Sequence, residues 1–206
     1  MTAPSWDTLT IFEDLFWQQG LLVAGTDEVG RGPLAGPVVA AAVILDPARP
    51  IEGLDDSKKL SLSRRLELFE RIEAEACAVG VGAAGPRTIE RMNIYQAARL
   101  AMRRAIHRLP QQPDVVLSDA MPLPGSPYHT VALIRGDQRS ASIAAASIVA
   151  KVVRDRYMEA LAEQYPGYGF EEHRGYPTPQ HREAILTLGV SRAHRTTFLS
   201  KISIPR

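Results

Sequence analysis

The sequence predicts an α/β fold in which a mixed β-sheet is flanked by helices, with a small helical appendage at the C-terminus. Strand-sized apolar runs alternate with helical patterns after an opening pair of strands, an order typical of layered α/β domains. Residues 38–45 are apolar throughout, which indicates a strand buried on both faces. With 206 residues and 45% hydrophobic content, the chain can bury a substantial core. We predict a main domain over residues 1–164 and an appendage over residues 165–206.

The first third of the chain is expected to contain one helix and the opening strand pair. Apolar residues at helical spacing predict a helix over residues 6–19, which ends at Gly20. Short apolar runs predict strands at residues 21–26 and 38–45. The Gly- and Pro-rich stretch between these strands cannot continue a helix, so it is expected to form a turn.

The middle of the chain is expected to alternate between helices and one strand of small residues. Ser61 or Ser63 can cap a helix that runs to about Ala76. Residues 77–84 predict a strand, and a mostly helical stretch with a break at Asn93 follows it. The remaining expected elements are strands at 114–118 and 130–134, a long helix at 140–164, an irregular loop at 165–179, a short helix at 180–188 and a basic tail at 191–206.

Composition and charge narrow the classes of protein. The single Cys77 excludes an internal disulfide framework and a cysteine-rich zinc site. The sequence shows no signal-peptide pattern and no apolar run long enough to span a bilayer, so we expect a soluble, cytoplasmic protein without membrane contact. The net charge is +1, but acidic residues predominate in residues 1–48 and 111–130, and basic residues in the segments between and after them. This pattern suits a carboxylate pocket rimmed by Lys and Arg, and it also suits an ordinary mixed surface.

Carboxylates follow three of the expected strands at the point where each strand ends. Asp27 and Glu28 follow the first strand, Asp119 follows a later one, and Asp137 lies just beyond the last. If these strands are neighbours, four carboxylates meet in one pocket, where their mutual repulsion requires cations. Oxygen ligands without a Cys or His set point to Mg²⁺ or Mn²⁺ rather than to zinc. Two such ions, ~4 Å apart, can activate a water and stabilise the leaving oxygen in a phosphoryl displacement.

Each of these carboxylates also has a simpler interpretation. Asp27 and Glu28 could form an acidic surface turn, and Asp119 could be a turn residue at a strand end. Asp137 could cap the helix that begins near Ser140. The repeated pattern of a strand followed by an acid favours the metal site over these alternatives.

Several motifs together carry a resemblance to a known family. They are Asp27-Glu-Val-Gly-Arg-Gly-Pro-Leu-Ala-Gly-Pro-Val38, Asp56-Ser-Lys-Lys-Leu-Ser61, Asn93-Ile94, Ser118-Asp119, Gly136-Asp137, Ala144-Ala-Ala-Ser-Ile-Val-Ala-Lys151, Arg154-Asp-Arg156, Gly175-Tyr176, His181, His194-Arg195 and Phe198. In these motifs and in their order, the sequence resembles type 2 ribonuclease H (ribonuclease HII) of bacteria. The matches run from about residue 21 to residue 198. The first motif is highly specific, whereas several of the others are weak alone.

The resemblance implies an endonuclease with the ribonuclease H-like fold that uses divalent metal ions. Its expected substrates are RNA–DNA hybrids, in which it cuts the RNA strand, and duplex DNA with embedded ribonucleotides. Cleavage on the 5′ side of the ribonucleotide by a two-metal-ion mechanism would leave 3′-hydroxyl and 5′-phosphate ends. The resemblance further implies that residues 1–164 are catalytic and that residues 165–206 help to bind substrate. We expect a monomer, and any contact with a replication clamp is left open.

The resemblance also implies roles for individual residues. Asp27, Glu28, Asp119 and Asp137 correspond to the metal-binding carboxylates. The turn Gly30-Arg31-Gly32 corresponds to the family's sensor of the ribose 2′-OH, the group that distinguishes RNA from DNA. Tyr176 matches a tyrosine that packs against the sugar at the junction of RNA and DNA. Residues that fall near the nucleic-acid backbone in the family are Ser57, Lys58, Asn93, Ser147 and Lys151.

Alternatives remain for several of these residues and for the function as a whole. Arg31 could pair with a carboxylate, Tyr176 could be a packing residue of its loop, and Lys58 and Lys151 could be solvated surface charges. A ribonuclease H-like nuclease acting on DNA junctions is a rival enzyme. A non-catalytic phosphate- or nucleotide-binding module that uses the glycine turn as an anion site is a rival of another class. Departures from the family pattern are Val29, Ala120, Arg135 and Thr196-Thr197, and none of them removes a proposed metal ligand.

Overall fold

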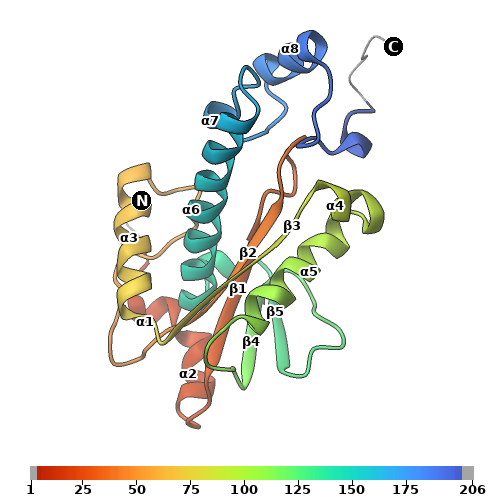
Figure 1. Cartoon of the computed structure of the whole chain (residues 1–206). Coiled ribbons are helices and arrows are strands. Elements are labelled where there is room, and N and C mark those ends of the chain that lie inside the picture. Colours follow the sequence, from red (N-terminus) through yellow and green to blue (C-terminus); the bar gives the residue numbers. More distant parts are fainter. Residues whose placement is uncertain (1–3, 201–206) are drawn as a thin grey trace.

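A five-stranded mixed sheet forms the centre of the computed structural model, which describes residues 4–200 (Figure 1). The strand order is β3-β2-β1-β4-β5. The elements in chain order are α1 (Trp6–Leu9), α2 (Ile11–Trp17), β1 (Val23–Val29), β2 (Val38–Ile44), α3 (Leu62–Glu75), β3 (Ala78–Ala84), α4 (Pro86–Met92), α5 (Ile94–His107), β4 (Val115–Asp119), β5 (His129–Leu133), η1 (Gly136–Gln138), α6 (Ala141–Gln164), α7 (Phe170–His173), α8 (Pro179–Leu188) and η2 (Thr196–Phe198). The mixed sheet flanked by helices confirms the predicted fold class.

The direction of the strands changes at β1. β1 and β2 form an antiparallel pair, and so do β2 and β3. On its other side β1 pairs in parallel with β4, and β4 pairs in parallel with β5. The C-terminal ends of β1, β4 and β5 therefore lie at the same end of the sheet, as the alternation of strands with helices predicts.

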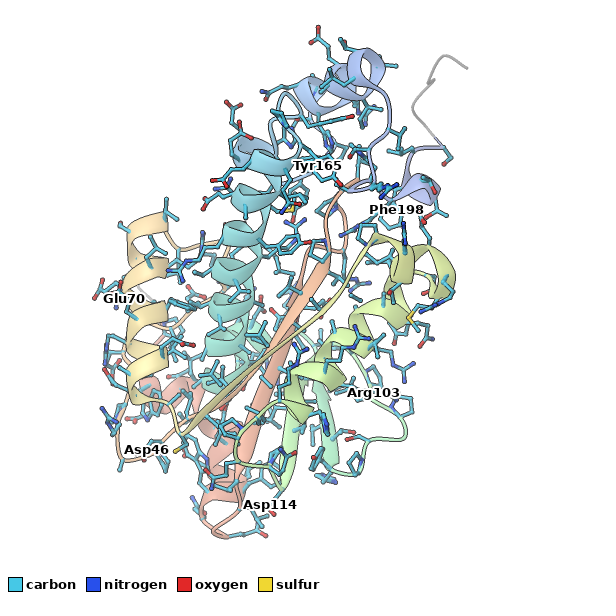
Figure 2. All side chains as sticks on the ribbon, viewed as in Figure 1. Asp46, Glu70, Arg103, Asp114, Tyr165 and Phe198 are labelled. Carbon is cyan, nitrogen blue, oxygen red and sulfur yellow. The ribbon has the colours of Figure 1, made fainter. Side chains whose placement is uncertain are left out.

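Helices cover both faces of the sheet. Figure 1 shows α3 and α6 on one side and α5 on the other, and the contacts between elements agree. Each side has its own core of buried apolar side chains, and side chains fill the space between the ribbons (Figure 2). β2 is buried at every position, which confirms the prediction from its uninterrupted apolar sequence.

Small residues let the helices approach the strands closely. A Cβ added to Gly25 of β1 would lie 2.1 Å from the backbone of Ser142 in α6. On the opposite face, a Cβ on Gly82 of β3 would lie 2.2 Å from the carbonyl oxygen of Ala101 in α5. Neither position can accept a side chain without separating helix and sheet.

Polar side chains fix where the long helices begin. Ser61 rather than Ser63 caps α3, because its side chain accepts from the N–H of Arg64. Asn93 breaks the helical stretch as predicted, with φ +67°, and its side chain accepts from the N–H of Gln96 to cap α5. Ser140 caps α6, so Asp137 does not fill that role.

The N-terminal elements differ from the predicted ones in two ways. The predicted single helix over residues 6–19 is interrupted at Thr10, which separates α1 from α2. The predicted strand end at Thr26 is wrong, because β1 continues to Val29 while it pairs with β2. In the described segment 4–200, no helix is long and apolar enough to cross a membrane.

The C-terminal region is more structured than the sequence predicts. The expected irregular loop over residues 165–179 contains the short helix α7. The expected basic tail is also wrong for its described part, because His194 and Arg195 are buried and Ala35 forms a β-bridge with His194. The rest of that tail, residues 201–206, lies outside the described residues. The division of the chain at residue 164 stays a prediction.

Candidate active site

Asp27 and Glu28 lie on β1 just beyond the point where its pairing with β4 ends. β1 pairs with β4 as far as Thr26, opposite Ser118, whereas its pairing with β2 continues to Val29. Asp27 and Glu28 follow Thr26 directly and therefore lie beside an open edge. Both residues lie within the strand, with no turn between them.

The two side chains point to opposite faces of β1. Asp27 is opposite Ala41, which belongs to the core on the α6 side, and Glu28 is opposite Ala40, which belongs to the core on the α5 side. Adjacent residues of a strand alternate in this way. The carboxylates thus approach the same edge from two directions.

Asp119 is the last residue of β4, and it fixes the position of the turn that carries Asp137. Its Oδ1 accepts from the backbone N–H of Gly136 at 2.7 Å, which ties the end of β4 to the 3₁₀ turn η1 that carries Asp137. Ala120 has φ +47°. This left-handed conformation is one that glycine adopts without steric cost, so Ala120 introduces local strain in this chain.

One pocket of about 240 Å³ brings most of the predicted site residues together. Its lining consists of Asp27, Glu28, Val29, Gly30, Arg31, Gly32, Lys58, Asp119 and Tyr176. Asp137 is absent from this lining but lies close enough for its charge to raise the pKa of Asp27. The pocket thus combines residues from β1, the turn after it, the loop before α3, the end of β4 and the segment before α8.

Burial and mutual repulsion disfavour the charged forms of these carboxylates. Burial raises the pKa of Asp27 well above its usual range, and the charges of Glu28 and Asp119 add to this effect. Burial likewise raises the pKa of Glu28 to about 7, although Arg31 partly offsets it. The pKa of Asp137 rises to about 6, through burial and the charge of Asp119. A bound cation would reverse this trend because it favours ionised ligands.

The carboxylates are the type of ligand that a hard cation binds, but their side chains do not form a complete coordination site in this structure. No group of three or more His, Cys, Asp or Glu side chains within the described range 4–200 is arranged to hold a metal ion as it stands. Oε2 of Glu28 is nevertheless buried without a hydrogen-bond partner. A buried acceptor of this kind destabilises the protein unless a ligand satisfies it. Oxygen donors of carboxylates are the ligands that Mg²⁺ and Mn²⁺ prefer.

Lys58 is the basic residue that faces the acidic cluster. Burial acts to lower its pKa, but the charges of Asp56, Asp27 and Asp137 outweigh burial and raise it. The backbone N–H of Lys58 donates to Oδ1 of Asp56 at 3.0 Å, which fixes the loop. Lys58 lines the pocket and is exposed to solvent, so the alternative of a solvated charge stays open.

The glycine turn and Tyr176 line the same pocket as Asp27, Glu28 and Asp119. Arg31 pairs with Glu28 at 3.2 Å while its side chain stays 51% exposed, which matches the alternative of a carboxylate partner. Tyr176 is 39% exposed, so its ring offers a surface to a ligand. A Cβ on Gly32 would lie 3.8 Å from Cε1 of Tyr176, which places the turn and the ring side by side.

Four predicted substrate contacts lie outside the pocket lining. Ser57 is buried, and its carbonyl accepts from Arg65. Ser147 is 2% exposed, and its hydroxyl donates to the carbonyl of Ala144. Asn93 caps α5, and Lys151 pairs with Asp155 at 2.7 Å. The structure therefore gives each of these four residues an internal partner.

Sequence reasoning missed two buried arginines beneath the turn. Arg154 and Arg195 are 0% exposed and donate to backbone carbonyls of the segment 30–37. A buried arginine that binds carbonyl groups leaves no periodic pattern in the sequence. The motifs Arg154-Asp-Arg156 and His194-Arg195 contained them, but their role could not be seen there.

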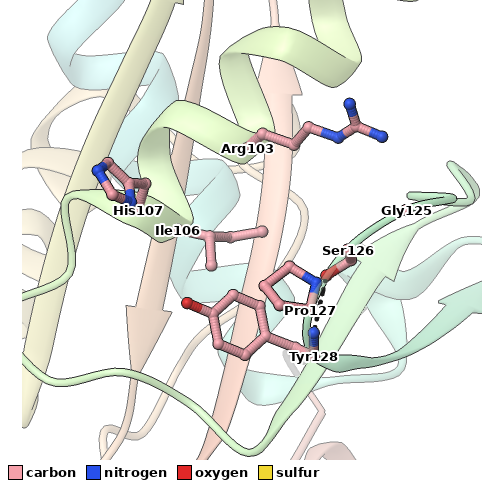
Figure 3. A pocket seen from close by; sticks show the side chains of 7 residues that line it. All are labelled: Arg103, Ile106, His107, Gly125, Ser126, Pro127 and Tyr128. Atoms are coloured by element: carbon pink, nitrogen blue, oxygen red, sulfur yellow. Dashed lines mark hydrogen bonds between the residues drawn. The ribbon is translucent and has the colours of Figure 1, made fainter.

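A second pocket, of about 170 Å³, lies on the α5 side of the sheet (Figure 3). Arg103, His107 and Tyr128 are among its lining residues, and no carboxylate is. Arg103 donates to the carbonyl of Pro124, and the hydroxyl of Tyr128 pairs with the side chain of Gln112. Without acidic oxygen ligands, this pocket is not suited to the metal chemistry of the first.

Comparisons with known proteins show which family the chain belongs to. A family model described as Ribonuclease HII matches residues 24–201. A protein named Ribonuclease HII from Vibrio cholerae is 55% identical over 177 residues, 86% of each chain. The solved ribonuclease H2 from Pyrococcus horikoshii OT3 has a TM-score of 0.74 at 27% identity, covering 88% of this chain and 97% of its own.

A further solved structure is described as a PCNA:RNase HII complex from Archaeoglobus fulgidus. It has a TM-score of 0.69 at 31% identity and covers 85% of this chain and 94% of its own. The sequence and structure comparisons therefore both cover most of the chain. This chain belongs to the ribonuclease HII family.

Proposed function

We propose that this protein is an endoribonuclease that hydrolyses the RNA strand of RNA–DNA hybrids and cuts on the 5′ side of ribonucleotides embedded in duplex DNA. The observation that carries the proposal is the shared pocket: three of the four carboxylates, the glycine turn and Tyr176 line one cavity, and Asp137 lies beside it. A site that both checks the sugar and cuts the adjacent phosphate requires these two groups of residues to be neighbours.

Asp27, Glu28, Asp119 and Asp137 would hold Mg²⁺ or Mn²⁺, with two ions when substrate is bound. When bound, these ions would supply Lewis acidity to activate water and to stabilise the leaving oxygen, which yields 3′-hydroxyl and 5′-phosphate ends. The chain contributes four carboxylate ligands: two near the end of β1, one at the end of β4 and one in the 3₁₀ turn η1. Its open β1 edge lets Asp27 and Glu28 approach the same point from opposite faces.

The sugar check is assigned to the turn Gly30-Arg31-Gly32 and to Tyr176. Glycines allow a backbone to approach a ligand closely, and the Tyr176 ring beside Gly32 offers an apolar surface to a deoxyribose. Lys58 lies where it can neutralise a phosphate. We also keep Ser57, Asn93, Ser147 and Lys151 as candidate substrate contacts that act after a local rearrangement, because each now has an internal partner.

The wider setting follows from the same proposal. We propose that residues 1–164 form the catalytic domain and that residues 165–206 help to bind substrate. The protein is proposed to act as a monomer in the cytoplasm, in the removal of ribonucleotides from DNA. A replication-clamp partner is named for the Archaeoglobus fulgidus relative, and no residue within 4–200 of this chain is assigned to such a contact.

The test is cleavage of end-labelled duplexes in Mg²⁺, in Mn²⁺ and in chelator. We expect metal-dependent cuts in an RNA–DNA hybrid and one cut 5′ of a single ribonucleotide in duplex DNA. An all-DNA duplex and an all-DNA junction serve as controls and should stay intact. Cleavage of the all-DNA junction, or cleavage that persists in chelator, would contradict the proposal.

A further inference from the structure

Two guanidinium groups are buried under the turn between β1 and β2. Arg154 comes from α6, and Arg195 comes from the segment just before η2. Both side chains are 0% exposed. No carboxylate within residues 4–200 forms a salt bridge with either one. Burying a charge without an opposite charge destabilises a protein unless hydrogen bonds compensate for it.

Arg195 donates to three carbonyl groups of the turn, one from each nitrogen atom of its guanidinium group. Nη2 donates to the carbonyl of Gly30 at 2.7 Å, Nη1 to that of Arg31 at 3.1 Å, and Nε to that of Gly36 at 2.9 Å. The backbone N–H of Arg195 also donates to Leu34. A lysine in this position could not satisfy three carbonyls in a fixed plane, because its ammonium is a point charge.

Arg154 donates to carbonyl groups at the end of the turn and also lies near the Tyr176 ring. Its Nε donates to the carbonyl of Pro37 at 3.1 Å, and Nη2 to those of Ala35 and Arg174 at 3.4 and 3.0 Å. The guanidinium also lies 5.9 Å from the centre of the Tyr176 ring, within range of a cation–π contact. One side chain therefore joins the turn to the segment that carries the tyrosine.

These contacts determine which way the peptide groups of the turn face. No cis peptide occurs in residues 4–200, so the C=O and N–H of each peptide point in opposite directions. Because the carbonyls of Gly30 and Arg31 point inward to Arg195, the N–H groups of Arg31 and Gly32 point away from it. Both residues also line the pocket. Neither N–H donates to an acceptor within the described residues.

We infer that Arg154 and Arg195 are positioning residues for ribonucleotide recognition: they turn the carbonyls of the segment 30–37 inward and leave the N–H groups of Arg31 and Gly32 free for a sugar hydroxyl. This inference rests on the proposed function. It assigns to the two arginines a role through the turn rather than any contact with substrate. It also accounts for two like charges placed close together without a carboxylate, an arrangement that stability alone does not favour.

The test compares charge-retaining variants. Arg195→Lys and Arg154→Lys keep the charge and lose the fork, and Arg104→Lys is the matched control, since Arg104 donates to the carbonyl of Ala83 on β3, remote from the turn. Binding is measured in Ca²⁺ for a duplex with one ribonucleotide and for the same duplex in DNA. We expect Arg195→Lys to lower the preference for the ribonucleotide duplex at least about fivefold, in the range expected for loss of about one hydrogen bond.

The same experiment distinguishes positioning from a purely structural role. In the two turn variants, the affinity for the all-DNA duplex should stay within about twofold of wild type, because the other contacts with the phosphate backbone persist. Loss of fold would lower both affinities together. A folded Arg195→Lys variant with the wild-type preference would overturn the inference while leaving the proposed function intact. A wild-type protein without any preference would instead contradict the proposed function.

A measurement on the wild-type protein covers the case in which the variants do not fold. The amide hydrogens of Arg31 and Gly32 should exchange rapidly in the free protein. The ribonucleotide duplex should slow their exchange at least about tenfold relative to the all-DNA duplex, as expected when a free N–H gains an acceptor. Equal exchange of these two amides in both complexes would overturn the inference.

Discussion

The acidic cluster and the basic pair next to the turn 30–37 differ in how their buried charges are compensated. The acidic cluster of Asp27, Glu28, Asp119 and Asp137 is crowded, and burial raises the pKa of three of its members. Oε2 of Glu28 has no partner. The basic pair Arg154 and Arg195 is buried more completely, yet it donates to six backbone carbonyls.

This difference indicates that the acidic cluster binds a ligand, whereas the basic pair stabilises the turn beside it. Unsatisfied, repelling carboxylates lower stability until cations bind, so their arrangement indicates function. Guanidinium groups that donate to backbone carbonyls gain their compensation within the fold. This holds for all three nitrogen atoms of Arg195 and for two of Arg154, whose Nη1 is buried without a partner. Neutralising a charge should therefore have opposite effects on stability in the two clusters.

The largest effect should come from removing a metal ligand. We expect Asp27→Asn or Asp119→Asn to lower kcat on a one-ribonucleotide duplex by about a thousandfold or more, since each removes several kcal/mol of transition-state stabilisation. Thermal unfolding of Asp27→Asn should occur at a temperature equal to or above that of wild type, because a buried repelling charge is gone. Wild-type kcat in either variant would refute the ligand assignment.

Removing a charge from the basic pair should act on the fold instead. Arg195→Met deletes the donors to three buried carbonyls, so we expect the free energy of unfolding to fall by about 3 kcal/mol. Chemical denaturation of this variant beside Asp27→Asn gives the comparison directly. A stability loss in Asp27→Asn as large as in Arg195→Met would erase the proposed difference between the clusters.

Divalent metal should stabilise the acidic cluster. At about 100 times its Kd, Mg²⁺ or Mn²⁺ should add about 2.7 kcal/mol of stability, which raises Tm by about 5 °C or more in a chain of this size. Asp27→Asn should lose most of this shift. Glu67→Gln, which removes an exposed carboxylate paired with Arg64 on α3, should retain it. An equal shift in Asp27→Asn and wild type would show that the metal binds elsewhere.

A smaller effect should come from the buried histidines behind Tyr176. The ring nitrogens of His181 and His194 lie 3.1 Å apart, and burial lowers the pKa of each to about 4. The unfolded chain binds protons near pH 6.5, so it takes up protons that the folded protein excludes. Stability should therefore fall as pH decreases from about 6.5 to about 4.

The change in Tm between pH 7 and pH 5 measures this effect. The carboxylates act in the opposite direction over this range, so the difference between wild type and His194→Asn isolates the histidine contribution. Asn can replace Nδ1 as the acceptor from Ser191. We expect wild type to lose about 3 °C more than the variant, or roughly 1 kcal/mol after solvent screening. Equal losses would show that His194 binds a proton as readily in the folded protein as in the unfolded chain.

Much of the framework could be predicted because local chemistry determines it. The apolar run of β2, the cap at Ser61 and the break at Asn93 each follow from the residues at those positions. The strand-then-acid pattern also predicted correctly that Asp27 and Asp119 would lie near each other. Parallel neighbours bring their C-terminal ends together, so this part of the pocket follows from topology.

The remainder depends on contacts between distant segments. β1 extends past Thr26 because β2 continues to pair with it, and no local signal marks where β4 leaves the sheet. Arg195 reads as part of a basic tail, since its partners are backbone groups about 160 residues earlier in the chain. Ser147 and Lys151 lie on the predicted helix, but the choice of an internal partner over a substrate depends on packing.

The central claim is that one pocket both checks the sugar and cuts, and Gly32→Ala tests it most directly. The added methyl group would be in ordinary contact with Tyr176, 3.8 Å away, so the fold can accept it. Gly85→Ala is the matched control, because Gly85 has open space around it.

The measurement is kcat/KM for cleavage of a one-ribonucleotide duplex, together with Kd for the all-DNA duplex. We predict that Gly32→Ala lowers kcat/KM at least about tenfold, a loss of about 1.4 kcal/mol, while Kd and Tm match those of Gly85→Ala. A Gly32→Ala enzyme with the kcat/KM of the control would contradict the account, because the turn would then have no part in selecting the nucleotide that is cut.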